Sequence, residues 1–301
     1  MYGVKKPFTA AGKSGTMSHR LHETIRKGLE VKLRTHHEAW LIAGLFLVLF
    51  SGCATVEPPV SQARRFFDIL NRYPKTTEPL KLRQLTVASP LAPPVAAAQP
   101  DVFIMVHPAY SLFFRDANKA PRYPAAKYEL LSRQFDDEAR FMSEVARSGN
   151  ILVLIIPGRY LEESDAPLSY TTYLNTTVSA GDAVYYLYSD SPSNGTIAMN
   201  DMVDLYRFLQ VVKAGKVLVG GGYIGRCQRE FYNELTTYFE KSITYIVPEI
   251  STISPEDITE SEAVSILSGI ERRDYGPVRQ FIDKKLDRNA NVLSLPHKQE
   301  M

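Results

Sequence analysis

One segment of the chain combines residue types that suggest nucleophilic chemistry. Residues 220–227 read G-G-G-Y-I-G-R-C, directly after a short apolar run. Glycines let the backbone approach a ligand closely, and the N-terminus of a following helix lowers the pKa of a nearby thiol. Cys227 lies at that expected helix start, and His107 ends another apolar run. A thiol activated by an imidazole is typical of cysteine hydrolases and transferases, with Cys227 as nucleophile and His107 as base.

The same residues also have a purely structural interpretation. A lone cysteine in the first turn of a helix is usually a small buried apolar residue, and a lone histidine at a strand end usually forms a loop hydrogen bond. The glycines are neither a G-x-G-x-x-G motif after the first strand nor a phosphate loop with G-K-[ST]. We favour the structural interpretation, and the catalytic one stays open.

A ligand site is expected at the carboxyl ends of the strands, where open parallel sheets bind their ligands. Polar residues or glycines follow nearly every apolar run at this edge. The residues assigned to a candidate ligand site are Gly221, Gly222, Tyr223, Arg226, Arg159, Asp190 and Glu249. Arginines near a helix N-terminus favour an anion, whereas loop tyrosines suit a glycan or a peptide.

The segment G-G-G-Y-I-G-R-C resembles the isochorismatase-like cysteine hydrolases. That resemblance implies a β–α sheet with a nucleophilic cysteine, here Cys227, at the helix start after a late strand. The family also has an acidic residue after the first strand and a lysine further on. This chain has His107 at the first place and at best Arg159 at the second, so we do not transfer the family's activity.

Five short apolar runs predict the elements that position these residues. They are continuous rather than alternating, which is typical of parallel strands buried on both faces; they cover residues 102–106, 151–156, 183–188, 216–219 and 243–247. Helical patterns separate them, at residues 124–147, 200–214 and 225–241, with a less regular one between 158 and 182. The pattern predicts an α/β fold, a three-layer α/β/α sandwich with a mainly parallel five-stranded sheet, over residues 101–253. A helical C-terminal extension is expected over residues 254–301.

Two strand orders satisfy this pattern, and they differ in whether Cys227 and His107 meet. In the order 3-2-1-4-5, the first and fourth strands are neighbours about 4.8 Å apart, which brings the two side chains within reach. In the order 2-1-3-4-5, the third strand separates them. The sequence alone leaves both orders open.

The N-terminal part predicts a route to the cell envelope. Residues 40–53, W-L-I-A-G-L-F-L-V-L-F-S-G-C, form an uncharged apolar run. The run is too short to cross a bilayer core of about 30 Å but has the length of a signal-peptide core. Its F-S-G-C ending resembles the lipobox of bacterial lipoproteins, which implies lipidation of Cys53 and removal of residues 1–52. The alternative is an uncleaved inner-membrane anchor, and the chain start is Met1 or Met17.

The lipobox resemblance also implies a location and partners. Ala54 after the cysteine favours the outer membrane, with the domain facing the periplasm. Residues 53–100 then form the lipid anchor, a short helix over residues 60–73 and a Pro/Ala-rich spacer over residues 74–100, which holds the domain away from the membrane. The expected partners are the membrane and an envelope protein, peptide or glycan.

Charge and cysteine content argue against several other classes. Residues 1–39 contain eight Lys/Arg and three Glu, a net charge of +5, whereas the whole chain carries only +2. The basic character therefore belongs to the leader, which argues against nucleic-acid binding. There are two cysteines, so lipidation of Cys53 leaves Cys227 without an intramolecular disulfide partner. Only two histidines follow the leader, which argues against a zinc site of the Cys/His type. No cofactor is expected.

Overall fold

The computed structural model describes residues 68–86, 99–115, 123–158, 166–178, 183–191, 194–286 and 290–295. The apolar run at 40–53, Cys53 and most of the short helix expected over residues 60–73 lie outside these ranges. Among the described helices, none is long and apolar enough to cross a membrane.

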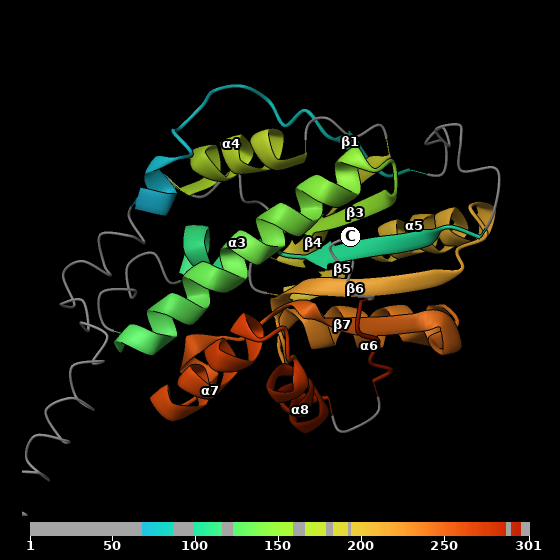
Figure 1. Ribbon diagram of the computed structural model, residues 1–301. Coiled ribbons are helices and arrows are strands. Elements are labelled where there is room, and N and C mark those ends of the chain that lie inside the picture. The colour runs from blue at the N-terminus through green and yellow to red at the C-terminus, as the bar shows by residue number, and fades with distance from the viewer. Residues whose placement is uncertain are drawn as a thin grey trace, which may run out of the picture. The chain divides into compact units, whose positions relative to one another are not determined.

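The described residues form an α/β fold around a mostly parallel open sheet (Figure 1). Its strands are β1 (Arg83–Gln84), β2 (Asp101–Val106), β3 (Ile151–Ile156), β4 (Val184–Ser191), β5 (Asn194–Ile197), β6 (Lys216–Tyr223) and β7 (Thr244–Thr252). Their order in space is β1-β4-β3-β2-β6-β7, and β5 pairs antiparallel with β4. The other pairings are parallel.

Helices connect these strands. They are η1 (Ser111–Arg115), α3 (Ala125–Arg147), α4 (Ala166–Val178), α5 (Met199–Val211), α6 (Cys227–Tyr238), η4 (Lys241–Ile243), η5 (Pro255–Asp257), α7 (Glu260–Glu271) and α8 (Gly276–Lys285). The start of α7 is fixed by a capping box, in which Thr259 and Glu262 bond each other's backbone N–H. The predicted helical extension after residue 254 is thus present as η5, α7 and α8.

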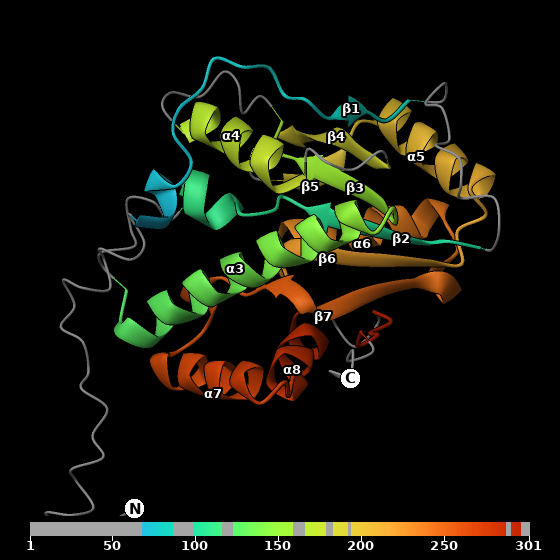
Figure 2. The ribbon, with the colours of Figure 1, turned by 45° about the horizontal axis from the view of Figure 1, so that its top comes forward.

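Alternate residues of the central strands enter two separate apolar clusters. On β2, Ile104 packs in the cluster that includes α5 and α6, whereas Met105 packs in the cluster that includes α3 and α4. Figures 1 and 2 accordingly show α3 and α4 over one face of the sheet and α5 and α6 over the other. All six residues of β3 are buried. Because both faces are covered, the strand sequences are apolar throughout rather than alternating.

The five predicted strands are present as β2, β3, β4, β6 and β7. In the predicted numbering their order is 3-2-1-4-5, the order that makes the first and fourth strands neighbours. The sheet also contains β1 and β5, which the apolar pattern did not predict, so a five-stranded sheet was an undercount. Both residues of β1 are exposed and the strand is two residues long, so it carries no apolar signal.

The segment after the short N-terminal helix differs from the predicted spacer. Residues 74–86 lie along α4 and enter the sheet. The Thr172 hydroxyl donates to the carbonyl of Pro74, and the Asn175 side chain bonds both Lys81 N–H and the carbonyl of Pro79. Leu85 is buried in the core. Part of the predicted spacer therefore belongs to the folded domain, since hydrogen bonds from its backbone to α4 side chains and the burial of Leu85 outweigh its Pro/Thr-rich composition.

The opposite edge of the sheet is covered by the end of the chain. Residues 290–295 run beside β7, where Ile246 and Val292 form a parallel bridge. Ile246 N–H donates to the carbonyl of Asn291, and Leu293 N–H donates to the carbonyl of Ile246. The polar tail predicted from residue 289 is thus, over these residues, an added edge of the sheet.

Replacing Leu85 with Ala tests whether residues 74–86 belong to the domain. Leu85 is 1% exposed, so the truncation should lower the free energy of unfolding by about 2–4 kcal/mol. Arg83→Ala on the exposed side of β1 is the matched control and should change it by less than about 0.5 kcal/mol. Urea denaturation of both variants gives the comparison. Equal small effects would mean that the segment is a spacer.

Candidate functional site

The candidate site lies at the carboxyl ends of β2 and β6. These strands pair in parallel with Val106 opposite Gly221, so His107 and Gly222 follow at the same edge. The backbone here is unusual, because His107 and Ala109 have positive φ values of 45° and 57°. Positive φ is uncommon outside glycine and often marks a functional or tightly constrained loop.

The glycines at this edge are required by close backbone packing. A Cβ at Gly221 would lie 2.5 Å from the carbonyl oxygen of Val106, and one at Gly222 would lie 2.8 Å from the same atom. Both residues also have positive φ. Gly221 and Gly222 thus have a structural reason, the approach of β6 to β2, that involves no ligand.

His107 is buried and bonded to Ser189 at the end of β4. Its Nε2 lies 2.8 Å from Ser189 Oγ, which also donates to the carbonyl of Ser191 and accepts from Gly158 N–H. Because the serine proton goes to Ser191, Nε2 must carry the proton that Ser189 Oγ accepts. Burial lowers the pKa of His107 to about 3, so the imidazole is neutral at physiological pH.

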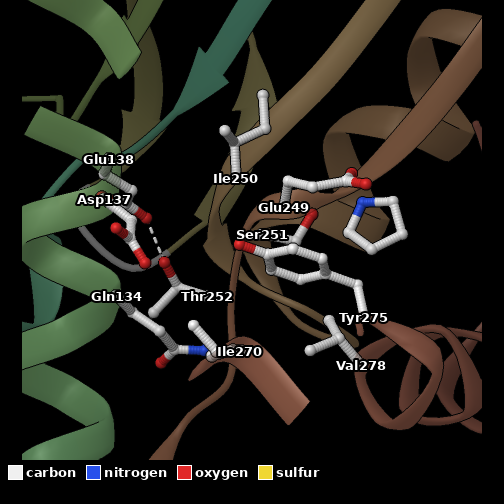
Figure 3. Close-up of a pocket in the computed structure, with 11 residues that line it drawn as sticks. Gln134, Asp137, Glu138, Glu249, Ile250, Ser251, Thr252, Ile270, Tyr275 and Val278 are labelled. Atoms are coloured by element: carbon white, nitrogen blue, oxygen red, sulfur yellow. Dashed lines mark hydrogen bonds between the residues drawn. The ribbon is translucent and has the colours of Figure 1, made fainter. Parts of the chain in front are cut away.

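Glu138 from α3 connects the loop after β2 to the end of β7. Its Oε2 accepts from Ala109 N–H at 2.9 Å, and its Oε1 accepts from the Thr252 hydroxyl (Figure 3). The carboxyl is fully buried, and burial raises its pKa to about 7, although both hydrogen bonds oppose the increase. The Glu138 carboxyl therefore changes protonation near neutral pH. It is hydrogen-bonded to the loop after β2, in which Ala109 has a positive φ.

Cys227 begins α6, as predicted, but its thiol is not activated. The side chain is 3% exposed, and Tyr223 N–H donates to Sγ at 3.2 Å. Burial raises the thiol pKa to about 11, the direction opposite to that expected from the helix start. His107 does not act on the thiol, because Nε2 bonds Ser189 and Nδ1 has no hydrogen-bond partner among the described residues. The strand order brings the two residues to one edge without forming a Cys–His pair.

The remaining candidate ligand residues have separate roles. Arg226 forms a two-pronged ion pair with Asp257 and lies 5.7 Å from the centre of the Tyr223 ring. Asp190 is exposed and accepts from the Thr196 hydroxyl at 3.0 Å. Glu249 lines a cavity with Gln134, whereas Gly222 and Tyr223 line one with His107. Arg159 lies outside the described residues. The structure thus brings together His107, Gly222 and Tyr223 around one cavity, with Arg226 over the Tyr223 ring. Glu249 lines the other cavity, and Asp190 lines neither.

The structure adds four buried polar residues that the sequence reasoning missed. They are Glu138, Ser189, Thr252 and Gln134, and each is less than a tenth exposed. A signal for Glu138 was present, because it continues the apolar stripe of α3 that runs through Leu131, Phe135 and Met142. An acid on the buried face of an amphipathic helix is rare unless it is paired. Ser189 directly follows the apolar run at residues 183–188, at the edge where a site was expected, whereas for Thr252 the sequence carried no comparable signal.

The described residues contain no group of three or more His, Cys, Asp or Glu placed to hold a metal ion. Comparisons with known proteins gave no match to this chain among protein-family models, curated proteins or solved structures. The function must therefore be argued from the geometry and the sequence.

Glu138→Gln isolates the effect of the buried acid on stability. The folded protein holds the Glu138 proton more tightly than the unfolded chain, whose pKa is 4.5. That stabilisation is complete below about pH 4.5 and is lost as the pH rises to about 7, a change of about 3 kcal/mol. The free energy of unfolding of the wild type should therefore fall relative to Glu138→Gln across this range, as measured by urea denaturation. Burial of neutral His107 acts in both proteins and cancels in the difference.

Glu144→Gln provides a control on the same helix, since Glu144 is exposed. Its difference from the wild type should change little with pH. A difference between wild type and Glu138→Gln that is equally constant would show that folding does not raise the pKa of Glu138.

The state of Cys227 can be measured by alkylation with iodoacetamide in the Cys53→Ser background, where it is the only thiol. With a pKa of about 11, the folded thiol at about pH 8 should react at least about 100-fold more slowly than the unfolded one, from its thiolate fraction alone. Burial slows the reaction further. Fast labelling of the folded protein with a thiolate titrating below about 8.5 would instead support the catalytic interpretation.

Proposed function

We propose that the protein is a membrane-tethered domain of the cell envelope that binds a ligand or partner and does not use Cys227 as a nucleophile. The tether is supported by the run W-L-I-A-G-L-F-L-V-L-F-S-G-C at residues 40–53, with Cys53 as the lipidated residue. The ligand class that suits this location is an envelope protein, a peptide or a glycan.

The observation that favours binding over catalysis is the state of Cys227. A nucleophilic cysteine needs a thiolate and access to substrate, yet this thiol is buried, with its pKa raised to about 11. The neighbouring polar groups of the sheet edge are used within the protein: His107 bonds Ser189, and Arg226 pairs with Asp257. Both contacts fix the positions of loops within the protein and leave these side chains bonded to other residues of the chain.

Burial of Cys227 also suits an exported protein. In an oxidising compartment an exposed lone thiol pairs with other thiols. Cys227 is buried at the start of α6, and a Cβ at Gly222 of β6 would lie 2.9 Å from its sulfur. A thiol held in this way survives export without an intramolecular partner.

The proposal also includes the layers of the fold and the membrane to which the protein is tethered. We infer a three-layer α/β/α arrangement, supported by the two apolar clusters on opposite faces of the sheet. The proposed site of action is the periplasmic face of the outer membrane. The alternative is the inner membrane, with residues 40–53 kept as an uncleaved anchor.

The tether is tested by Cys53→Ser with Cys227→Ser as the matched cysteine control. One acyl chain binds membranes only marginally, so stable anchoring needs several. Wild type and Cys227→Ser should incorporate labelled palmitate, lose residues 1–52 and partition into detergent. Cys53→Ser should take up no lipid and migrate as the larger precursor on a denaturing gel.

Two results would contradict the proposed tether. One is a Cys53→Ser protein processed to the wild-type size, which indicates an ordinary signal peptide. The other is a wild type that stays in the membrane without lipid and without cleavage, which indicates a plain anchor.

A further inference from the structure

Two small cavities lie on either side of Glu138. The first is lined by Gln134, Glu249 and Tyr275, and the second by His107, Tyr110 and Gly222. Glu138 and Thr252, which are bonded to each other, line both. Figure 3 shows the first cavity, with Gln134 and Glu138 extending from α3 toward the end of β7. The Glu138–Thr252 pair thus belongs to the walls of both cavities.

Each cavity is lined by a buried side chain with at least one polar atom that has no hydrogen-bond partner among the described residues. In the second cavity, His107 Nδ1 is an acceptor, because Nε2 carries the proton, and it has no partner among the described residues. In the first cavity, both the Nε2 and the Oε1 atoms of Gln134 lack a partner within the same part of the chain. His107 is 1% and Gln134 6% exposed. Buried polar groups of this kind are costly unless a small molecule satisfies them.

The size of the cavities decides what that molecule is. In each, the space open to the centre of a water molecule is about 10 Å³. A bound water needs about that much space and two to four polar partners. A sugar, peptide or nucleotide does not fit into either space.

We propose that each cavity is a built site for one ordered water, and that the two waters connect His107 Nδ1 and the Gln134 amide to the Glu138–Thr252 pair. The water in the His107 cavity donates to His107 Nδ1. The water in the Gln134 cavity exchanges hydrogen bonds with the amide of Gln134, which both donates and accepts. The result is a hydrogen-bonded path from the end of β2, through β7, to α3.

The Glu138 carboxyl is the natural junction of this path. It already accepts from Ala109 N–H and Thr252, and each oxygen has a further lone pair for a water. Its pKa of about 7 supports the inference, because protons then enter and leave a fully buried group, and ordered waters supply a route for them. The proposal does not depend on the tether or on the identity of the ligand.

High-resolution crystallography of the full-length wild type gives the direct test. We expect one water within about 2.7–3.2 Å of His107 Nδ1 and one within the same range of the Gln134 amide. Density for both waters supports the proposal. A map in which either cavity is dry overturns it.

Gln134→Met provides a second, independent readout. This variant removes the amide and keeps the side-chain length. If Gln134 is hydrated, the urea midpoint should fall or stay the same, because the variant loses satisfied hydrogen bonds. If the amide is unsatisfied, replacing it with an apolar group should raise the midpoint, and that result would overturn the proposal. Gln280→Met on the exposed face of α8 controls for the intrinsic effect of the same substitution in a helix.

Discussion

The pairing of β2 with β6 is the constraint on which the rest of the site depends. It places the start of α6 beside the loop after β2 and sets the order of the whole sheet. The close approach at Val106 is possible only because Gly221 and Gly222 have no side chain. The same approach leaves the Cys227 sulfur in a space bounded by Gly222 and Tyr223. One backbone contact therefore explains Gly221 and Gly222, the burial of the thiol and the position of His107.

The buried ionisable groups at this edge act in opposite directions on stability. Burial favours neutral imidazole at His107, whose folded pKa is about 3 against 6.5 in the unfolded chain. Burial also favours neutral carboxyl at Glu138, whose folded pKa is about 7. Between about pH 4.5 and pH 6.5, the contribution of His107 to folding stability increases as the pH rises, and that of Glu138 decreases. The opposing slopes flatten the dependence of folding stability on pH in mildly acidic conditions.

Much of the sheet could be predicted from the sequence, because strands buried on both faces must be apolar throughout. β2, β3 and β6 are such strands, and their runs are unmistakable. The strand order could not be predicted, since the same apolar pattern fits either order. β1 was missed because both of its side chains face solvent, so its place in the sheet comes only from backbone bonds to β4.

The candidate site was predicted less well than the sheet. Residue type and spacing correctly placed His107 and Cys227 at one edge, but they could not give the direction of the thiol pKa. That direction depends on burial by Gly222, Tyr223 and their neighbours, which is a tertiary property. Glu138 was overlooked because helical periodicity was used to find apolar residues. A polar residue on the apolar face of α3 indicates a buried acid, and Glu138 is that residue.

The chain end beside β7 has a consequence for how copies of this protein meet. The outer strand of an open sheet presents unpaired N–H and C=O groups, which can accept a strand from another molecule. At Ile246 both groups are already bonded, to Asn291 and Leu293 of the same chain. At the other edge, β1 is only two residues long, too short to template a long intermolecular ladder. At these two places the described sheet therefore offers little unpaired backbone to a strand of another molecule.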